Sequence, residues 1–318
     1  MRAGLCKIIN WKEVTHNMAW FFTALVAAII SSVGNIIDSH LLSKKMPSLP
    51  SLLIPMGLTQ LIGGVVFLAI FPFPANPDLM HILVACGAGL LNACGYLGIL
   101  NSLRKSEVSR VIPVISSAPI FVALLSIPLL GEMLNLWQWF AIMITVVGAV
   151  LISLQMDGGG RKARLQKSFF ILLFVALMLA VASIGFKYAL EKISFWNMWG
   201  INGISIATVI LIYSLRKKNI LELRNLNQRT RNILIIVVDV CLGITAGILG
   251  FKALEIGHVA LVNALLNVRP AFVFIFSLVL SAFFPTVIND HLNKRTALIK
   301  FIAVALMTAG IVIISLSS

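Results

Sequence analysis

PIFVALLS, residues 119–126, recurs as PAFVFIFS at residues 270–277, with proline, phenylalanine, valine and serine at the same places. The two stretches are 151 positions apart, and the same offset lays SVGNII at 32–37 over SIGFKY at 183–188. That second pair shares a serine and a glycine. Because separate segments keep one offset, the chain is predicted to contain two copies of one structural unit.

The segments around these stretches are long and apolar. Of the 318 residues, 59% are hydrophobic and 11% are charged, whereas soluble domains carry about 25% charged residues. A helix needs roughly 20 mostly apolar residues to cross the hydrocarbon core of a bilayer. The sequence therefore predicts an all-α polytopic membrane protein with ten transmembrane helices, at about 19–41, 51–71, 80–100, 111–130, 136–154, 169–190, 196–215, 232–251, 259–283 and 297–316.

Each copy of the unit contains five of these predicted spans, which is an odd number. The second copy must therefore enter the membrane with the opposite orientation, as in the inverted repeats of many secondary transporters. The last matching pair, GAVLISL at 148–154 and GIVIISL at 310–316, is offset by 162, which places an insertion at 283–295. The predicted organisation is an N-terminal extramembrane segment, a first repeat, a basic linker and a second repeat, at 1–18, 19–155, 156–168 and 169–318.

The net charge of +14 is concentrated in alternate connections. Basic residues follow the first, third, fifth and seventh predicted spans and precede the tenth. The positive-inside rule then places these connections in the cytoplasm and both termini outside, in a multi-pass protein of the plasma (inner) membrane. Clustering in short loops between spans also argues against nucleic acid as a partner.

One long stretch carries a family resemblance. KSEVSRVIPVISSAPIFVALLSIPLLGEMLNLWQWFAIMITVVGAVLI, residues 105–152, has a proline within the fourth span, a Gly131-Glu132 pair at its end, and a glycine-led apolar run from Gly148. It resembles the repeat unit of the drug/metabolite transporter superfamily, EamA type, and NIIDSHLLSK at 35–44 is similar to that family too. In the second copy, Phe283-Phe284 replaces the Gly-Glu pair.

The resemblance implies a ten-helix transporter with a central path between the two repeats. It implies that the third, fourth, eighth and ninth spans line the path, with contributions from the first and sixth. It also implies cytoplasmic termini, which is the opposite of the orientation that the charges indicate. Members of the superfamily carry amino acids, sugars, nucleotide derivatives, drugs and other metabolites, so the resemblance does not identify the solute.

Arg269 is the deepest cation, ten residues into the ninth span. Such a charge costs about 2.5–3.5 kcal/mol at a helix centre and is by default a candidate for function. It could face the path and bind a carboxylate, which suits its planar guanidinium. It could instead pair with Asp239 or bond a carbonyl freed near Pro270, or face lipid. Ala118 occupies the equivalent position in the first repeat, so the charge is not required by the shared architecture.

Other polar residues in the spans are candidates for the same path. Asn263, Asn267, Asn92 and Tyr96 are predicted to bind substrate, and Tyr96 could equally be a packing residue. On a continuous helix the two ninth-span asparagines would point away from Arg269. Asp239 begins a stripe of small residues with Gly243, Ala246 and Gly250, which suits close contact between helices.

Three charged residues are candidates for coupling or ion pairing: Asp239, Asp38 and Lys187. Asp38 could otherwise lie at the membrane interface, and Lys187 could extend to the lipid headgroups. Pro113, Pro119 and Pro270 free backbone carbonyls and are predicted to act as hinges.

The expected function is secondary transport of a small metabolite, amino acid or drug-like solute by alternating access, with export as the expected direction. A lipid-linked headgroup flippase or a membrane scaffold is the alternative. An enzyme is not expected, because the sequence has no HExxH, GxSxG or phosphate loop and no evident pair of deep carboxylates. The expected partners are the bilayer, a solute that could carry a carboxylate, and a second copy of the chain; no cofactor or metal is expected.

Overall fold

The computed structural model describes residues 11–44, 46, 48–73, 78–105, 108–153, 167–224, 229–283 and 294–317. The first ten residues, most of the predicted linker at 156–168 and most of the predicted insertion at 283–295 lie outside them. Within the described ranges every regular element is a helix. These are α1 (Trp11–Lys44), α2 (Leu49–Ile70), α3 (Leu79–Lys105), α4 (Val108–Ile115), α5 (Ala118–Leu130), α6 (Leu136–Ser153), α7 (Lys167–Ala189), α8 (Phe195–Ser214), α9 (Lys217–Arg224), α10 (Arg229–Ile256), α11 (Val259–Leu266), α12 (Arg269–Phe283) and α13 (Lys294–Ser317).

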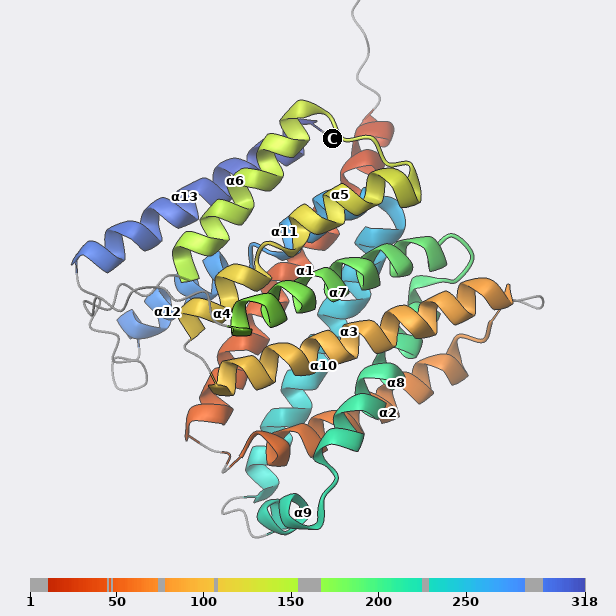
Figure 1. Cartoon of the computed structure of the whole chain (residues 1–318), viewed down its shortest axis with the longest axis vertical. Helices are drawn as coiled ribbons and strands as arrows, with labels where there is room; N and C mark the ends of the chain where they lie inside the picture. The colour runs from red at the N-terminus through yellow and green to blue at the C-terminus, as the bar shows by residue number, and fades with distance from the viewer. Residues whose placement is uncertain are drawn as a thin grey trace, which may run out of the picture.

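The helices agree with the predicted all-α polytopic membrane fold. In the described part of the chain, eight segments are long and apolar enough to cross a bilayer, and two shorter apolar helices, Ala118–Leu130 and Leu136–Ile152, accompany them. Each of the ten predicted apolar runs therefore corresponds to one helix or one pair of helices. The short helix α9 is additional, and it lies at the end of the molecule far from the C-terminus (Figure 1).

The fourth and ninth predicted spans are each broken into two helices. The first break, at Ser116 and Ser117, separates α4 from α5, and the second, at Asn267 and Val268, separates α11 from α12. Proline has no N–H and is tolerated in the first turn of a helix, and Pro119 and Pro270 are the second residues of α5 and α12.

The backbone hydrogen bonds at the two breaks are equivalent. Ser117 N donates to Val114 O at 3.2 Å, and Val268 N donates to Leu265 O at 3.1 Å. The next bonds, from Ile120 N and from Ala271 N, also match at an offset of 151 residues. The sequence repeat is therefore a repeat of backbone geometry at its most irregular point.

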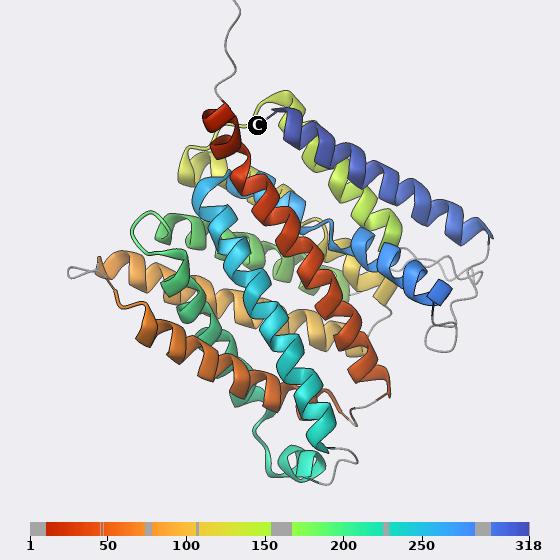
Figure 2. The same ribbon diagram turned by 180° about the vertical axis from the view of Figure 1, so that it is seen from behind.

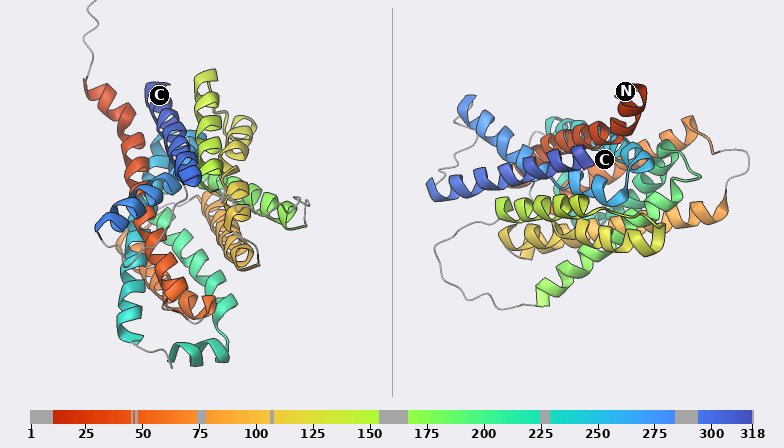
Figure 3. Two further views of the ribbon diagram at one scale, coloured as in Figure 1. Left: turned by 90° about the vertical axis from the view of Figure 1, so that its left-hand side faces the viewer. Right: turned by 90° about the horizontal axis from the view of Figure 1, so that it is seen from above.

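The contacts between helices are reciprocal, as two units related by a two-fold axis require. Helix α1 packs on α10, and the equivalent helices α7 and α3 pack on each other. The remaining equivalents pair directly: α2 packs on α8, and α6 packs on α13. Figure 2 shows α1 and α10 side by side, and Figures 1 and 3 show α6 and α13 running together at one edge.

The start of α1 and the end of α13 lie at the same end of the molecule (Figure 2). We call this end the terminal face and the other end the basic face. The basic face contains α9 with the exposed residues Arg216, Lys217 and Lys218. The basic face therefore contains exposed cations of the kind on which the orientation prediction rests.

Candidate functional site

A cavity of about 590 Å³ lies between the two repeats. Its walls come from α1, α2, α3, α4, α5, α7, α8, α10, α11 and α12. The second and seventh predicted spans, which are α2 and α8, thus contribute to the wall, and the resemblance had not implied this. Gln60 of α2 and Asn202 of α8 are their polar residues in the lining.

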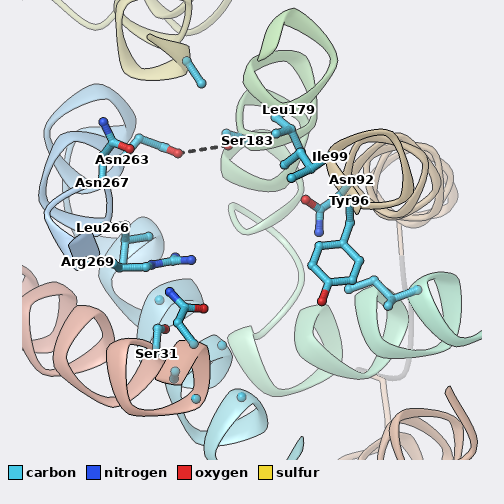
Figure 4. A pocket seen from close by; sticks show the side chains of 18 of the residues that line it. Ser31, Asn92, Tyr96, Ile99, Leu179, Ser183, Asn263, Leu266, Asn267 and Arg269 are labelled. Atoms are coloured by element: carbon cyan, nitrogen blue, oxygen red, sulfur yellow. Dashed lines mark hydrogen bonds between the residues drawn. The ribbon is translucent and has the colours of Figure 1, made fainter. Parts of the chain in front are cut away.

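Arg269 lines this cavity at the beginning of α12. Its side chain points from α12 toward the side where Asn92 and Tyr96 stand on α3 (Figure 4). Its Nε atom is buried and has no hydrogen-bond partner, and no ion pair joins it to Asp239 in the described part of the chain. The backbone around it is held in place, because Ser32 Oγ donates to Arg269 O at 3.1 Å. A cation whose Nε–H has no partner is suited to bind an anionic group.

Three of the predicted asparagines are anchored in the wall by hydrogen bonds. Asn267 Nδ2 donates to Ser116 O at 2.8 Å, which joins the two helix breaks at positions 151 residues apart. Ser183 Oγ donates to Asn263 Oδ1 at 3.2 Å (Figure 4). Asn92 Nδ2 donates to Asn202 Oδ1 at 3.1 Å. Each amide keeps further hydrogen-bonding capacity, so the wall can offer polar groups on both sides of a ligand.

The prediction that Arg269 and the ninth-span asparagines point apart is wrong. It assumed one continuous helix, in which residues are separated by 100° each. The break at Asn267 and Val268 changes the helix direction between them, and Arg269, Asn263 and Asn267 all line the same cavity.

Asp38 and Asp239 form a pair of carboxyl groups in the cavity wall. They come from α1 and α10, both line the cavity, and they lie within hydrogen-bonding reach of each other. Asp239 is only 5% exposed. The expectation of no paired deep carboxylates is thus wrong, because 201 residues separate the two aspartates and only the packing of α1 on α10 joins them.

Lys187 does not line the cavity. Its Nζ donates to the carbonyl oxygens of Leu254 and Gly257 at 2.8 Å each, and to that of Glu255 at 3.3 Å. A cation at the C-terminus of a helix satisfies carbonyls that lack intrahelical partners and is attracted by the helix dipole. Lys187 therefore caps α10 and is held by the protein rather than extended toward headgroups.

The Gly131-Glu132 pair holds the turn on the other side of Gly257. Gly131 has a φ of 69°, the left-handed conformation that ends α5. The chain then directs Glu132 to the first residue of α11, where Val259 N donates to its Oε2 at 3.0 Å and to its Oε1 at 3.2 Å. Lys187 and Glu132 thus clamp the α10–α11 connection, Lys187 at the end of α10 and Glu132 at the start of α11.

The cavity is closed toward the terminal face. Phe186 of α7 and Phe251 of α10, both 5% exposed, line it there and pack edge to face with ring centroids 5.0 Å apart. The equivalent residues of the other repeat are Asn35 and Leu100. Asn35 is exposed although it lines the cavity, so the two ends are not in the same state.

The predicted small-residue stripe of the eighth span has a different role from the one expected. Gly243 and Gly250 line the cavity, and a Cβ atom at Gly243 would meet no atom within 4 Å. Close packing occurs instead on α3, where a Cβ atom at Gly95 would lie 2.7 Å from Leu179 Cδ2. Gly243 and Gly250 therefore provide space in the cavity, whereas Gly95 provides contact between helices.

The predicted hinges occupy two different settings. Pro119 and Pro270 line the cavity next to the helix breaks, and Pro113 lies within α4. Ser183, Gln60, Asn35 and Asn202 also line the cavity and were not predicted. An isolated serine or amide inside an apolar run gives a weak signal, since it also occurs at ordinary helix contacts.

The fold and the cavity define a class of protein, a polytopic helical membrane protein with a polar cavity between two repeats. Residues 18–154 match the EamA-like transporter family. A solved structure titled only "Crystal structure of protein" has the same fold, with 18% identity, a TM-score of 0.66, and coverage of 94% of this chain and 96% of that chain. No curated protein matches the sequence.

The match over residues 18–154 agrees with the predicted resemblance to EamA-type members of the drug/metabolite transporter superfamily.

Proposed function

We propose that this protein is a secondary transporter that binds a small solute bearing a carboxylate in the central cavity. The observation that carries the proposal is Arg269, whose guanidinium lines the cavity and whose Nε has no partner. A buried cation without a counterion is costly in a membrane protein. A carboxylate that forms two parallel hydrogen bonds with the guanidinium would relieve that cost and fix the orientation of the solute.

Transport proceeds by alternating access across the plasma membrane. Inverted repeats allow one half to adopt the conformation of the other, so that the cavity opens to each side in turn. The contact between Phe186 and Phe251 closes the terminal face, and the exposure of Asn35 supports an opening on the other side. Because the basic face is cytoplasmic by the positive-inside rule, this conformation would load solute from inside, and export is the direction that we propose.

Solute binding can be tested on the purified protein by thermal stabilisation. The panel contains monocarboxylates, dicarboxylates and amino acids, each beside its uncharged amide. We expect the carboxylates, and not the amides, to raise the melting temperature of the wild type and of Arg216→Ala, which removes an exposed arginine. Arg269→Ala should fold, because Ala118 occupies the equivalent position, and should lose this response.

Transport itself is tested by counterflow of the stabilising solute, labelled, in liposomes. Saturable counterflow that Arg269→Ala abolishes is the expected result. If no member of the panel binds or moves, while a lipid with a labelled headgroup crosses the bilayer, the protein is a flippase and the proposed function is wrong.

A further inference from the structure

We propose that Asp38 and Asp239 together form a proton-binding site that couples solute movement to proton movement. This inference rests on the proposed transport function and identifies the second species that the cavity carries. The site consists of two carboxyl groups that come from different repeats and share one proton.

The first observation is the geometry of the pair. The two carboxyl groups lie within hydrogen-bonding reach of each other, yet Oδ1 of each is buried with no N–H or O–H donor. Asp239 is also pressed against the neighbouring helix, since a Cβ atom at Gly34 of α1 would lie 3.1 Å from its Oδ1. A contact between two carboxyl groups requires a proton as its donor, so one proton held between them satisfies oxygens that otherwise have no donor.

The second observation comes from the repeat. Asp239 corresponds to Ala88, and Asp38 corresponds to Ala189, at the offset of 151. The helix contact is reproduced in the other copy, where a Cβ atom at Gly185 would lie 2.9 Å from Ala88 Cβ. The packing of α1 on α10 therefore does not require carboxyl groups. The equivalent helix contact in the other repeat is formed with alanine at both positions, so neither aspartate is needed for packing. Both aspartates line the cavity.

The other charged groups around the cavity do not neutralise the pair. Among the residues that line it, the remaining titratable side chains are Tyr96 on α3 and Arg269 on α12. The lining residues of α2, α7, α8 and α11 are polar or apolar without a titratable group. No ion pair with Asp38 or Asp239 is present in the described residues, so a proton is the species that removes the repulsion between the two carboxylates.

Coupling follows from the position of the pair between the repeats. Because α1 and α10 belong to different halves, alternating access changes their contact. When the two carboxyl groups are together they hold one proton between them. When the helices separate, one carboxyl group loses its partner and releases that proton. The solute on Arg269 and the proton on the aspartates then occupy one cavity in turn.

The proton can be detected without any knowledge of the solute. Infrared spectra of the purified protein at neutral pH should show the C=O stretching band of a protonated carboxyl group in the wild type. The band should disappear in Asp38→Asn and in Asp239→Asn, and should persist in Asp78→Asn, which changes an aspartate outside the cavity. Retention of the band in both cavity variants would overturn the proposal. Its replacement by carboxylate bands when sodium chloride is added would identify a metal-cation site instead.

Coupling is tested with whichever solute the counterflow assay identifies. A pH gradient should drive accumulation of that solute in liposomes with the wild type. Asp38→Asn should abolish accumulation driven by the gradient and retain counterflow exchange. Equal loss of both activities would contradict a coupling role. Because the infrared test needs no solute, a protein that holds the proton but transports nothing would disprove the proposed transport function and leave the proton site intact.

Discussion

At the residue scale, the form of the cation at position 269 should matter as well as its charge. Arg269→Lys keeps the charge but loses the planar pair of donors that matches a carboxylate. Hydrogen bonds to charged groups contribute about 1.5–3 kcal/mol, so we expect the dissociation constant of the solute to rise about 10- to 100-fold. Thermal-shift titration measures it, with Arg216→Lys as the matched control on an exposed arginine. Equal affinity in wild type and Arg269→Lys would show that only the charge is used.

Single residues could be identified from the sequence where a polar or charged side chain within a span has an unusually high free energy of insertion into the membrane. Arg269, Asp239 and the asparagines of the ninth span were candidates for this reason, and all of them line the cavity. The partnership of Asp38 with Asp239 could not be foreseen, because it depends on which helices pack together. Lys187 shows the same limit, since its three carbonyl partners are at the end of a helix that only the fold brings near.

At the element scale, the beginning of α11 depends on a side chain from the other repeat. Glu132 accepts two hydrogen bonds from Val259 N, and its side chain is only 10% exposed. Loss of an acceptor at a helix N-terminus costs about 0.5–2 kcal/mol. We expect Glu132→Ala to lower the melting temperature of the protein, which intrinsic tryptophan fluorescence measures. Glu191→Ala, which changes an exposed glutamate, should leave it unchanged, and an equal decrease in both variants would rule out a specific cap.

A second prediction concerns the crossing of α6 and α13. A Cβ atom at Gly148 would lie 2.7 Å from Met307 Cγ and 2.9 Å from Ala303 O, so the helices must separate to accept it. Overpacking of this kind costs about 1–3 kcal/mol, and Gly148→Ala should lower the melting temperature. Gly87 is exposed and a Cβ atom there meets nothing within 4 Å. The same substitution there should be neutral or stabilising by about 0.5–1 kcal/mol. A stabilising effect at both sites would mean that α6 and α13 leave room for a methyl group at Gly148.

The elements themselves were well predicted, but two of their boundaries were not. Ten apolar runs can be counted from hydropathy alone, and the helices follow them. The breaks within the fourth and ninth spans have no hydropathy signal, because the runs stay apolar through them. Pro119 and Pro270 indicated an irregularity, yet a proline can kink a helix as well as break it. The orientation of Arg269 was therefore mispredicted by a helical projection that crossed a break.

At the scale of the whole molecule, the repeat explains both what is symmetric and what is not. The pairing of α1 with α10 and of α7 with α3 follows from an offset that the sequence displays. The closure of one end cannot be derived from that offset, because both halves carry the same architecture. The residues that hold the α10–α11 connection, Glu132 and Lys187, are not repeated in sequence, since Ile36 stands at the position equivalent to Lys187. In the second repeat, Phe283 takes the place of Glu132 at the offset of 151.

Alternating access through this symmetry makes a prediction about the two ends of the cavity. In a variant without native cysteines, Phe186→Cys with Phe251→Cys should be joined by a short thiosulfonate cross-linker, because these side chains are in contact at the closed terminal face. The cross-link should stop counterflow until a reductant is added. Asn35→Cys with Leu100→Cys, at the equivalent positions, should be joined only when the transported solute is present, since these residues approach when the halves exchange conformations. Two results would argue against alternating access. One is cross-linking of both pairs in the absence of solute, and the other is a yield of the second cross-link that does not change when solute is added. The control is a variant with Phe186→Cys alone, which the reagent can modify but cannot bridge. Any loss of counterflow in this control reports the size of the attached reagent and not a cross-link.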